Sequence, residues 1–91
     1  MATSTIKGTE KTVQTLSSSD NLNSLTNPNI MYMWPAGVSP ANSPSSGCTM
    51  FCKRTGWGIL QVAINYDTTP MIWVRHLFTN SWGAWKRVQL S

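Results

Sequence analysis

Residues 57–77 have the sequence WGILQVAINYDTTPMIWVRHL, and this stretch decides the fold. Two runs of apolar, β-branched and aromatic residues flank the polar segment DTTP, a pattern typical of two strands joined by a hairpin loop. Because so short a link cannot form a parallel crossover, we expect the strands to pair antiparallel. Side chains alternate between the two faces of a strand, so the first strand should have a core face and a partly wet face. We assign Leu60, Val62, Ile64 and Tyr66 to the core face, and Gln61, Ala63 and Asn65 to the partly wet face.

Three more strands are expected outside this hairpin. IMYMW at 30–34 and CTMFCKR at 48–54 predict two strands before it, and AWKRVQL at 84–90 predicts one after it. The Pro-rich segment 35–47 is too rich in proline for regular structure and is expected to be an ordered loop. The sequence therefore predicts a mainly β fold, a small antiparallel sheet or sandwich of about five short strands with one short helical turn.

The chain is expected to divide into two parts. Residues 1–17 are rich in Ser and Thr and predict an extended or flexible N-terminal lead-in that ends in a short edge strand. Residues 18–91 are assigned to a knob-like β domain. At its start, Ser18 or Ser19 is expected to cap the helical turn, and Asp20 is assigned a structural role near the positive end of that turn.

Length and charge restrict the classes of protein to which this chain can belong. Its 91 residues make one domain, and seven Lys and Arg against three acids give a net charge of +4. The cations are scattered, which indicates a mildly basic solvated surface, although a small β domain that binds single-stranded nucleic acid remains an alternative. No apolar run approaches the length of a membrane span, and the first residues do not have the pattern of a signal peptide. We therefore expect synthesis in the cytoplasm and no membrane insertion.

Catalysis and metal binding find little support in the sequence. The carboxylates Glu10, Asp20 and Asp67 fall in separate segments and predict no catalytic pair. Cys48 and Cys52 would lie roughly 13 Å apart on one strand, too far for a disulfide. With a single histidine in the chain, they cannot complete a zinc site. We expect two reduced, half-buried thiols on one face of a strand, no metal, no cofactor and no enzymatic activity.

Several polar and aromatic residues are expected to hold the fold together. Gln61 and Arg75 lie inside apolar strands, and such groups need hydrogen-bond partners when buried. We expect both to bond loop carbonyls or a neighbouring subunit, and so to fix the Pro-rich loop or the register between subunits. Asn42 is expected to bond the backbone of its own loop. Trp85 is expected to close the bottom of the core by packing on the face of Leu60.

Four segments resemble, in their order and spacing, the pyocin-knob domains of phage and R-type pyocin tail fibres. They are DNLNSLTNP at 20–28, YMWPAGVSPANSP at 32–44, LQVAIN at 60–65 and WVRHLFTNSWGAWKRV at 73–88. The resemblance covers 20–88, most of the chain. It implies a homotrimeric domain that forms part of a virion tail fibre and reaches toward the bacterial cell surface.

This resemblance suggests that the chain is the C-terminal knob of a distal tail fibre. Its expected role is host-surface recognition through binding of a bacterial surface glycan. Aromatic rings can stack on the CH faces of sugars, whereas amide groups can reach the hydroxyls. Trp82 is the expected stacking ring, with Asn80 and Asn42 as hydroxyl partners. The alternative is a purely structural, trimerising knob with no ligand.

Overall fold

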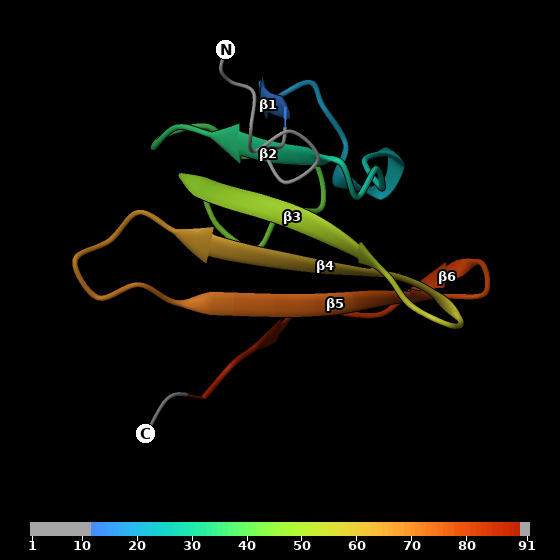
Figure 1. Ribbon diagram of the computed structural model, residues 1–91. Helices are drawn as coiled ribbons and strands as arrows, with labels where there is room; N and C mark the ends of the chain where they lie inside the picture. Colours follow the sequence, from blue (N-terminus) through green and yellow to red (C-terminus); the bar gives the residue numbers. More distant parts are fainter. Residues whose placement is uncertain (1–11, 90–91) are drawn as a thin grey trace, which may run out of the picture.

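The computed structural model describes residues 12–89, which form one twisted sheet with a single short helix (Figure 1). The prediction of a mainly β fold is confirmed. The strands are β1 (Thr12–Thr15), β2 (Ile30–Trp34), β3 (Cys48–Arg54), β4 (Gly58–Asn65), β5 (Ile72–Phe78), β6 (Ser81–Trp82) and β7 (Lys86–Arg87). The helix is a 3₁₀ turn, η1 (Leu22–Ser24).

The sheet is mixed rather than fully antiparallel. Neighbouring strands follow the order β1-β2-β3-β4-β5, and both β6 and β7 pair with β5. The pairs from β2 to β5 are antiparallel as expected, but β1 lies parallel to β2, with Thr12 opposite Ile30. The chain between these two strands contains η1 and supplies the crossover that a parallel pair requires. β1 is the edge strand expected at the end of the N-terminal lead-in, and residues 1–11 lie outside the described residues.

The strand predicted at 84–90 is much shorter. Within that range the structure has β7, beside the N-terminal half of β5, whereas β6 precedes the range and lies beside the C-terminal end of β5. Residues 83–85 between them belong to no strand. The Gly83 N–H nevertheless donates to the His76 carbonyl at 3.0 Å, so this segment stays beside β5.

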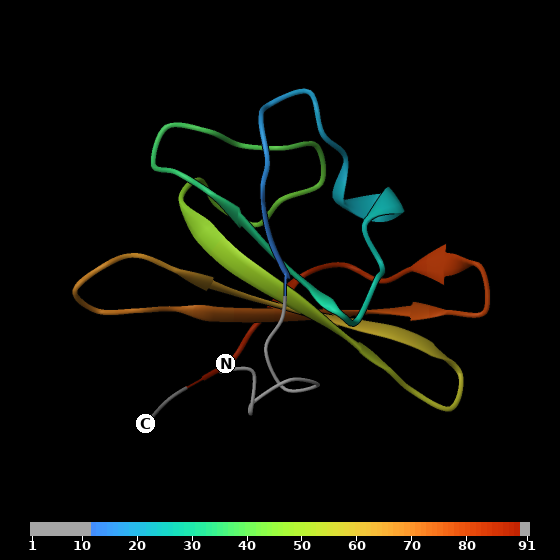
Figure 2. The same cartoon turned by 45° about the horizontal axis from the view of Figure 1, so that its top comes forward.

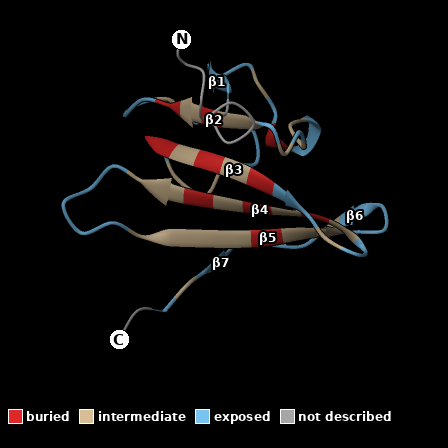
Figure 3. Cartoon of the chain, in the orientation of Figure 1, coloured by how far each residue is buried: buried red, intermediate tan, exposed pale blue. Residues whose placement is uncertain are grey.

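The two faces of β4 are the reverse of the prediction. Buried and partly buried residues alternate along β4 (Figure 3). The phase of this alternation is shifted by one residue relative to the prediction. The buried face holds Gln61, at 0% exposure, between Ile59 and Ala63. The predicted core residues lie on the opposite, partly covered face: Leu60, Val62, Ile64 and Tyr66. Gln61 can be buried because its amide donates to two backbone carbonyls, at 2.8 and 2.9 Å, which leaves no polar group without a partner.

The buried face of the sheet is covered by the segments that connect the first three strands. Its core includes Trp34 of β2 and Met50 of β3, and Leu22 of η1 is fully buried against them. Figure 2 shows η1 and the 35–47 loop on the same side of the sheet. Trp34 Nε1 donates to the Ser45 carbonyl at 2.9 Å, which ties this loop to the core.

The helical turn begins later than predicted. Its N-cap is Asn21, whose side-chain oxygen accepts a backbone N–H of the first turn at 2.9 Å, rather than Ser18 or Ser19. Asp20 Oδ2 instead accepts the Ser17 N–H at 2.7 Å. Asp20 therefore stabilises the turn that precedes the helix and not the positive end of the helix.

The two cysteines are core residues. Cys48 and Cys52 lie on one face of β3, as predicted, and both are free thiols, but they are buried rather than half-buried. Burial raises the pKa of each thiol to about 11. Because the thiolate is the reactive form, both cysteines act as packing groups at neutral pH.

Candidate functional site

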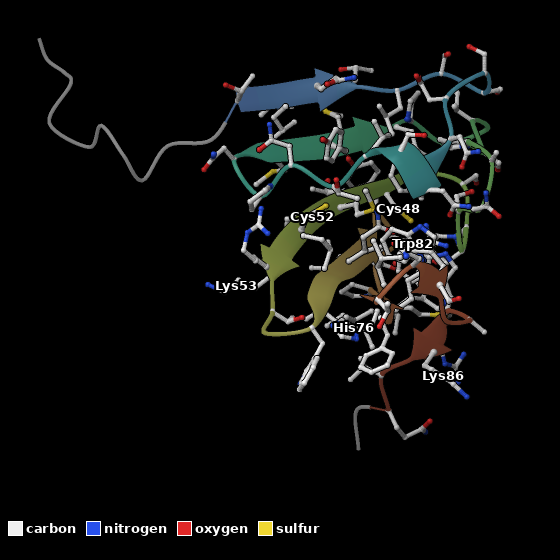
Figure 4. All side chains as sticks on the ribbon, turned by 90° about the vertical axis from the view of Figure 1, so that its right-hand side faces the viewer. Cys48, Cys52, Lys53, His76, Trp82 and Lys86 are labelled. Carbon is white, nitrogen blue, oxygen red and sulfur yellow. The ribbon has the colours of Figure 1, made fainter. Side chains whose placement is uncertain are left out.

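A hollow of about 490 Å³ lies between η1, the 35–47 loop and the C-terminal segment. It is lined by Asn23, Asn42, Ser43, Arg75, Trp82, Gly83, Ala84 and Trp85. These residues are brought together from distant parts of the chain, so the hollow exists only in the folded protein. Figure 4 shows Trp82 next to η1, on the opposite side of the molecule from Lys53.

Trp82 and Trp85 flank the guanidinium group of Arg75. The Arg75 Cζ atom lies 4.0 Å from the centroid of the Trp82 ring and 4.8 Å from that of Trp85. The strand register explains this arrangement, because Trp82 pairs with Leu77 and Trp85 directly precedes β7, which places both indoles on the Arg75 face of β5. A cation this close to an aromatic ring is attracted by the ring quadrupole. Trp82 and Trp85, which lie where the chain passes from β6 to β7, thus form the aromatic wall of the hollow.

Arg75 forms the floor of the hollow, and the fully buried Gln61 is its hydrogen-bond partner outside the lining. Arg75 Nε donates to Gln61 Oε1 at 2.8 Å, and Arg75 Nη2 donates to Asn23 Oδ1 at 2.9 Å. Gln61 Nε2 donates in turn to the carbonyls of Leu22 and Leu25. These bonds fix η1 and not, as predicted, the Pro-rich loop. Burial lowers the pKa of Arg75 to about 10, which leaves the guanidinium cationic at neutral pH.

Asn42 and Trp85 join the Pro-rich loop to the C-terminal segment. Trp85 Nε1 donates to the Asn42 carbonyl at 2.7 Å, so Trp85 packs on the Arg75 face and not on the predicted Leu60 face. Asn42 has a φ of 66°, a left-handed conformation that asparagine adopts more readily than most residues. Its Nδ2 donates to Asn21 Oδ1 at 2.8 Å, rather than to the backbone of its own loop. The loop is therefore held from both sides.

The structure assembles only part of the predicted ligand-binding trio. Trp82 and Asn42 both line the hollow, although they are far apart in the sequence. Asn80 lies in the exposed turn between β5 and β6 and is not among the lining residues. Asn23 and Arg75 occupy the hollow instead. The sequence has no local signal for Asn23, because Arg75 reaches it across 52 positions of the chain.

Other functional chemistry is limited in the part of the chain that the structure describes. Residues 12–89 contain no cluster of three or more His, Cys, Asp or Glu side chains that could hold a metal ion. None of the described helices is long and apolar enough to cross a membrane. His76 Nε2 forms a 2.7 Å hydrogen bond with Thr55 Oγ1, so this histidine has a structural partner.

The face of the sheet opposite the hollow is a second candidate surface, which we call the open face. Strand pairing places apolar side chains side by side across β1 to β5 on this face. They are Val13, Met31, Met33, Phe51, Leu60, Val62, Ile64, Ile72, Val74 and Phe78. All of them are partly or largely exposed. Because soluble monomers rarely expose a large contiguous apolar patch, the open face is a candidate interaction surface.

Comparison of the chain with protein-family models, with curated proteins and with solved structures finds no match. The groups that line the hollow include two indole rings, one guanidinium and two side-chain amides. A concave site that combines aromatic surface with a few convergent polar groups is typical of small-ligand binding. This combination suits sugars, which present both apolar CH faces and hydroxyl groups.

Proposed function

We propose that this chain is a knob domain of a phage tail fibre and contributes to host-surface recognition by binding a bacterial surface glycan in the hollow. The observation that carries the proposal is the packing of the Trp82 and Trp85 rings against Arg75, with the amides of Asn23 and Asn42 on the same hollow. The resemblance to pyocin-knob domains of tail fibres supplies the biological setting.

The hollow offers both kinds of contact that a sugar ring requires. Trp82 and Trp85 are partly exposed, so apolar ring surface remains available for stacking on sugar CH groups. The amide of Asn42 and the guanidinium of Arg75 can bond hydroxyl oxygens from the side and the floor. Hydrogen bonds hold both residues in place before a ligand arrives, which lowers the ordering cost of binding.

Tryptophan fluorescence during titration with oligosaccharides cut from bacterial surface polysaccharides tests the glycan site. Trp82→Ala is expected to keep the fold, because Trp82 lies at the border of the core, and to weaken per-site affinity at least tenfold. Trp57→Ala is the matched control, because Trp57 is 74% exposed and does not line the hollow. Its per-site affinity should equal that of the parent. A Trp82→Ala variant that binds like the parent would show that the hollow is not the glycan site.

The open face supports the second part of the proposal, that the knob is a homotrimer within a fibre. Within strands β1 to β5 its side chains include no acid, and its cationic side chain is Lys53. Covering such a face requires a partner surface that is equally apolar, and two further copies of the chain supply it. Burial of apolar area contributes about 25 cal/mol per Å², so burying the apolar side chains of the open face would contribute most of the free energy of trimer assembly. Three linked sites also raise avidity without any new contact.

Light scattering coupled to size exclusion tests the trimer and its interface together. The parent is expected to have three times the chain mass at micromolar concentration. Val62→Glu, in the middle of the open face, should yield a folded monomer, because an acid would be buried without a partner. Thr68→Glu, in the exposed β4–β5 loop, is the control and should remain trimeric. A monomeric parent overturns the trimer, and a trimeric Val62→Glu variant overturns the interface.

A further inference from the structure

We propose that the hollow selects acidic saccharides, with Arg75 receiving the anionic group of the sugar. This inference rests on the proposed glycan site and names the class of glycan that the site takes. The anionic group is an oxyanion, a sugar carboxylate or a sugar phosphate.

Arg75 has no counter-ion among the described residues. Its side chain is buried to 6% exposure, and its hydrogen-bond partners are the neutral amide oxygens of Gln61 and Asn23. Residues 12–89 contain two carboxylates, and both bond elsewhere, Asp20 to Ser17 and Asp67 to Thr68. A buried charge is costly unless it is paired, so an anion that enters the hollow gains more there than at a solvated lysine.

Arg75 also has hydrogen-bond donors that no described residue uses. A guanidinium has five N–H groups, and its bonds to Gln61 and Asn23 account for two of them. Among the described residues, no sealed-in side-chain nitrogen or oxygen lacks a partner. Nη1 has no hydrogen bond to a described residue, so it is open to solvent rather than sealed in. Because Arg75 lines the hollow, Nη1 and the second Nη2 proton can bond two oxygens of one oxyanion.

The aromatic wall favours one orientation of an acidic sugar in the hollow. Indole faces carry negative electrostatic potential, so they attract sugar CH groups and repel an anion. Trp82 and Trp85 would therefore hold the ring of the sugar and leave its acidic substituent at the guanidinium. The net charge of +4 adds a weak long-range attraction for anionic polysaccharides.

Three matched probes test this selectivity on the parent protein by tryptophan fluorescence. They are methyl β-glucuronide, methyl β-glucoside and glucose 6-phosphate. At about 20 mM salt we expect the glucuronide or the phosphate to bind at least tenfold more tightly than the neutral glucoside, and the preferred one identifies the oxyanion. The preference should shrink at high salt. Equal affinity for all three probes overturns acidic selectivity and leaves the glycan site intact. If neither the three probes nor the polysaccharide fragments bind, both acidic selectivity and the glycan site are overturned.

A charge-neutralising variant tests the role of Arg75 without removing it. Asn23→Asp keeps the side-chain shape and puts a carboxylate oxygen where Asn23 Oδ1 now accepts from Arg75 Nη2. This internal counter-ion should reduce the ratio of acidic to neutral affinity from at least ten to about one. Asn29→Asp makes the same charge change at an exposed turn outside the hollow and should keep the ratio. An unchanged ratio in Asn23→Asp would show that Arg75 does not select the anion.

Discussion

Arg75 Nε donates to Gln61 Oε1 at 2.8 Å, and the two residues lie directly opposite each other on β5 and β4. Gln61 extends this hydrogen-bond network, because its amide nitrogen donates to the carbonyls of Leu22 and Leu25. One line of hydrogen bonds therefore joins the floor of the hollow to the helical turn that covers the core. The guanidinium that is proposed to bind a ligand is thus positioned by the same bonds that hold the fold together.

Replacement of Gln61 is expected to be severely destabilising. Gln61→Leu removes the acceptor of Arg75 Nε and leaves this buried cationic N–H without a partner. It also removes the amide donor to the Leu22 and Leu25 carbonyls, which keep the Leu25 N–H and the Cys52 thiol as their remaining donors. A loss of about 3–5 kcal/mol in unfolding free energy follows from the penalty for uncompensated buried polar and charged groups. Urea denaturation measures it. The same substitution at exposed Gln14 should change stability by less than about 0.5 kcal/mol, and a loss below about 1 kcal/mol in Gln61→Leu would contradict the structural role of this residue.

Gly58 provides a second test of the sheet. A Cβ at this position would overlap the backbone carbonyl oxygen of Leu77 on β5, and the backbone cannot move aside without opening the β4–β5 ladder. Gly58→Ala should therefore lower the melting temperature by more than 10 °C, corresponding to about 2–3 kcal/mol in a domain of this size. Gly56→Ala is the control, because its Cβ would meet open space. Equal melting temperatures for the two variants would contradict the close approach.

The strands were predictable because their local patterns are strong. The bounds of β2 and β3 match the predicted segments, and the hairpin of β4 and β5 is where its apolar runs and polar loop place it. The phase of β4 was not predictable, because either face of that strand offers apolar residues. Burial of Gln61 depends on carbonyls contributed by a turn 36 and 39 residues away. Alternation alone therefore gives the strand but not the direction in which it faces.

The hollow was partly predictable for a similar reason. Aromatic residues next to a turn are a local signal, and Trp82 lies where that signal points. The contact between Arg75 and Asn23 depends on the crossover that places η1 over the sheet, and no spacing in the sequence specifies it. Asn80 lies outside the hollow, because proximity in sequence to Trp82 does not place a turn residue among the residues that line it.

The buried thiols predict a loss of stability in alkali. Below pH 9 the thiols of Cys48 and Cys52 keep their protons in both the folded and the unfolded chain. Between pH 9 and 11 the folded state keeps thiol protons that the unfolded state releases, so the unfolding free energy falls as pH rises. Arg75 acts in the opposite direction above about pH 10, because the folded state there releases a proton that the unfolded state keeps. Urea unfolding should show a loss of about 2–3 kcal/mol between pH 8 and pH 10.

The control for this loss removes the thiols. A Cys48→Ala, Cys52→Ser variant is expected to be less stable at pH 8, because it changes two core residues, but its stability should vary much less between pH 8 and pH 10. If the parent and the variant show the same pH dependence, other groups cause the alkaline loss.

Replacement of Thr79 is expected to stabilise the fold. It has a φ of 62°, which is rare for a β-branched residue and costs roughly 1–3 kcal/mol. The conformation persists because the Thr79 N–H donates to the Trp57 carbonyl at 3.2 Å and so joins two neighbouring turns. Thr79→Asn keeps this backbone bond and tolerates the left-handed conformation, so the unfolding free energy should rise by about 1 kcal/mol. Thr68→Asn is the control, because Thr68 lies at an exposed loop position without positive φ, and it should leave stability unchanged. A less stable Thr79→Asn variant would mean that the threonine side chain makes a stabilising contact that outweighs the backbone strain.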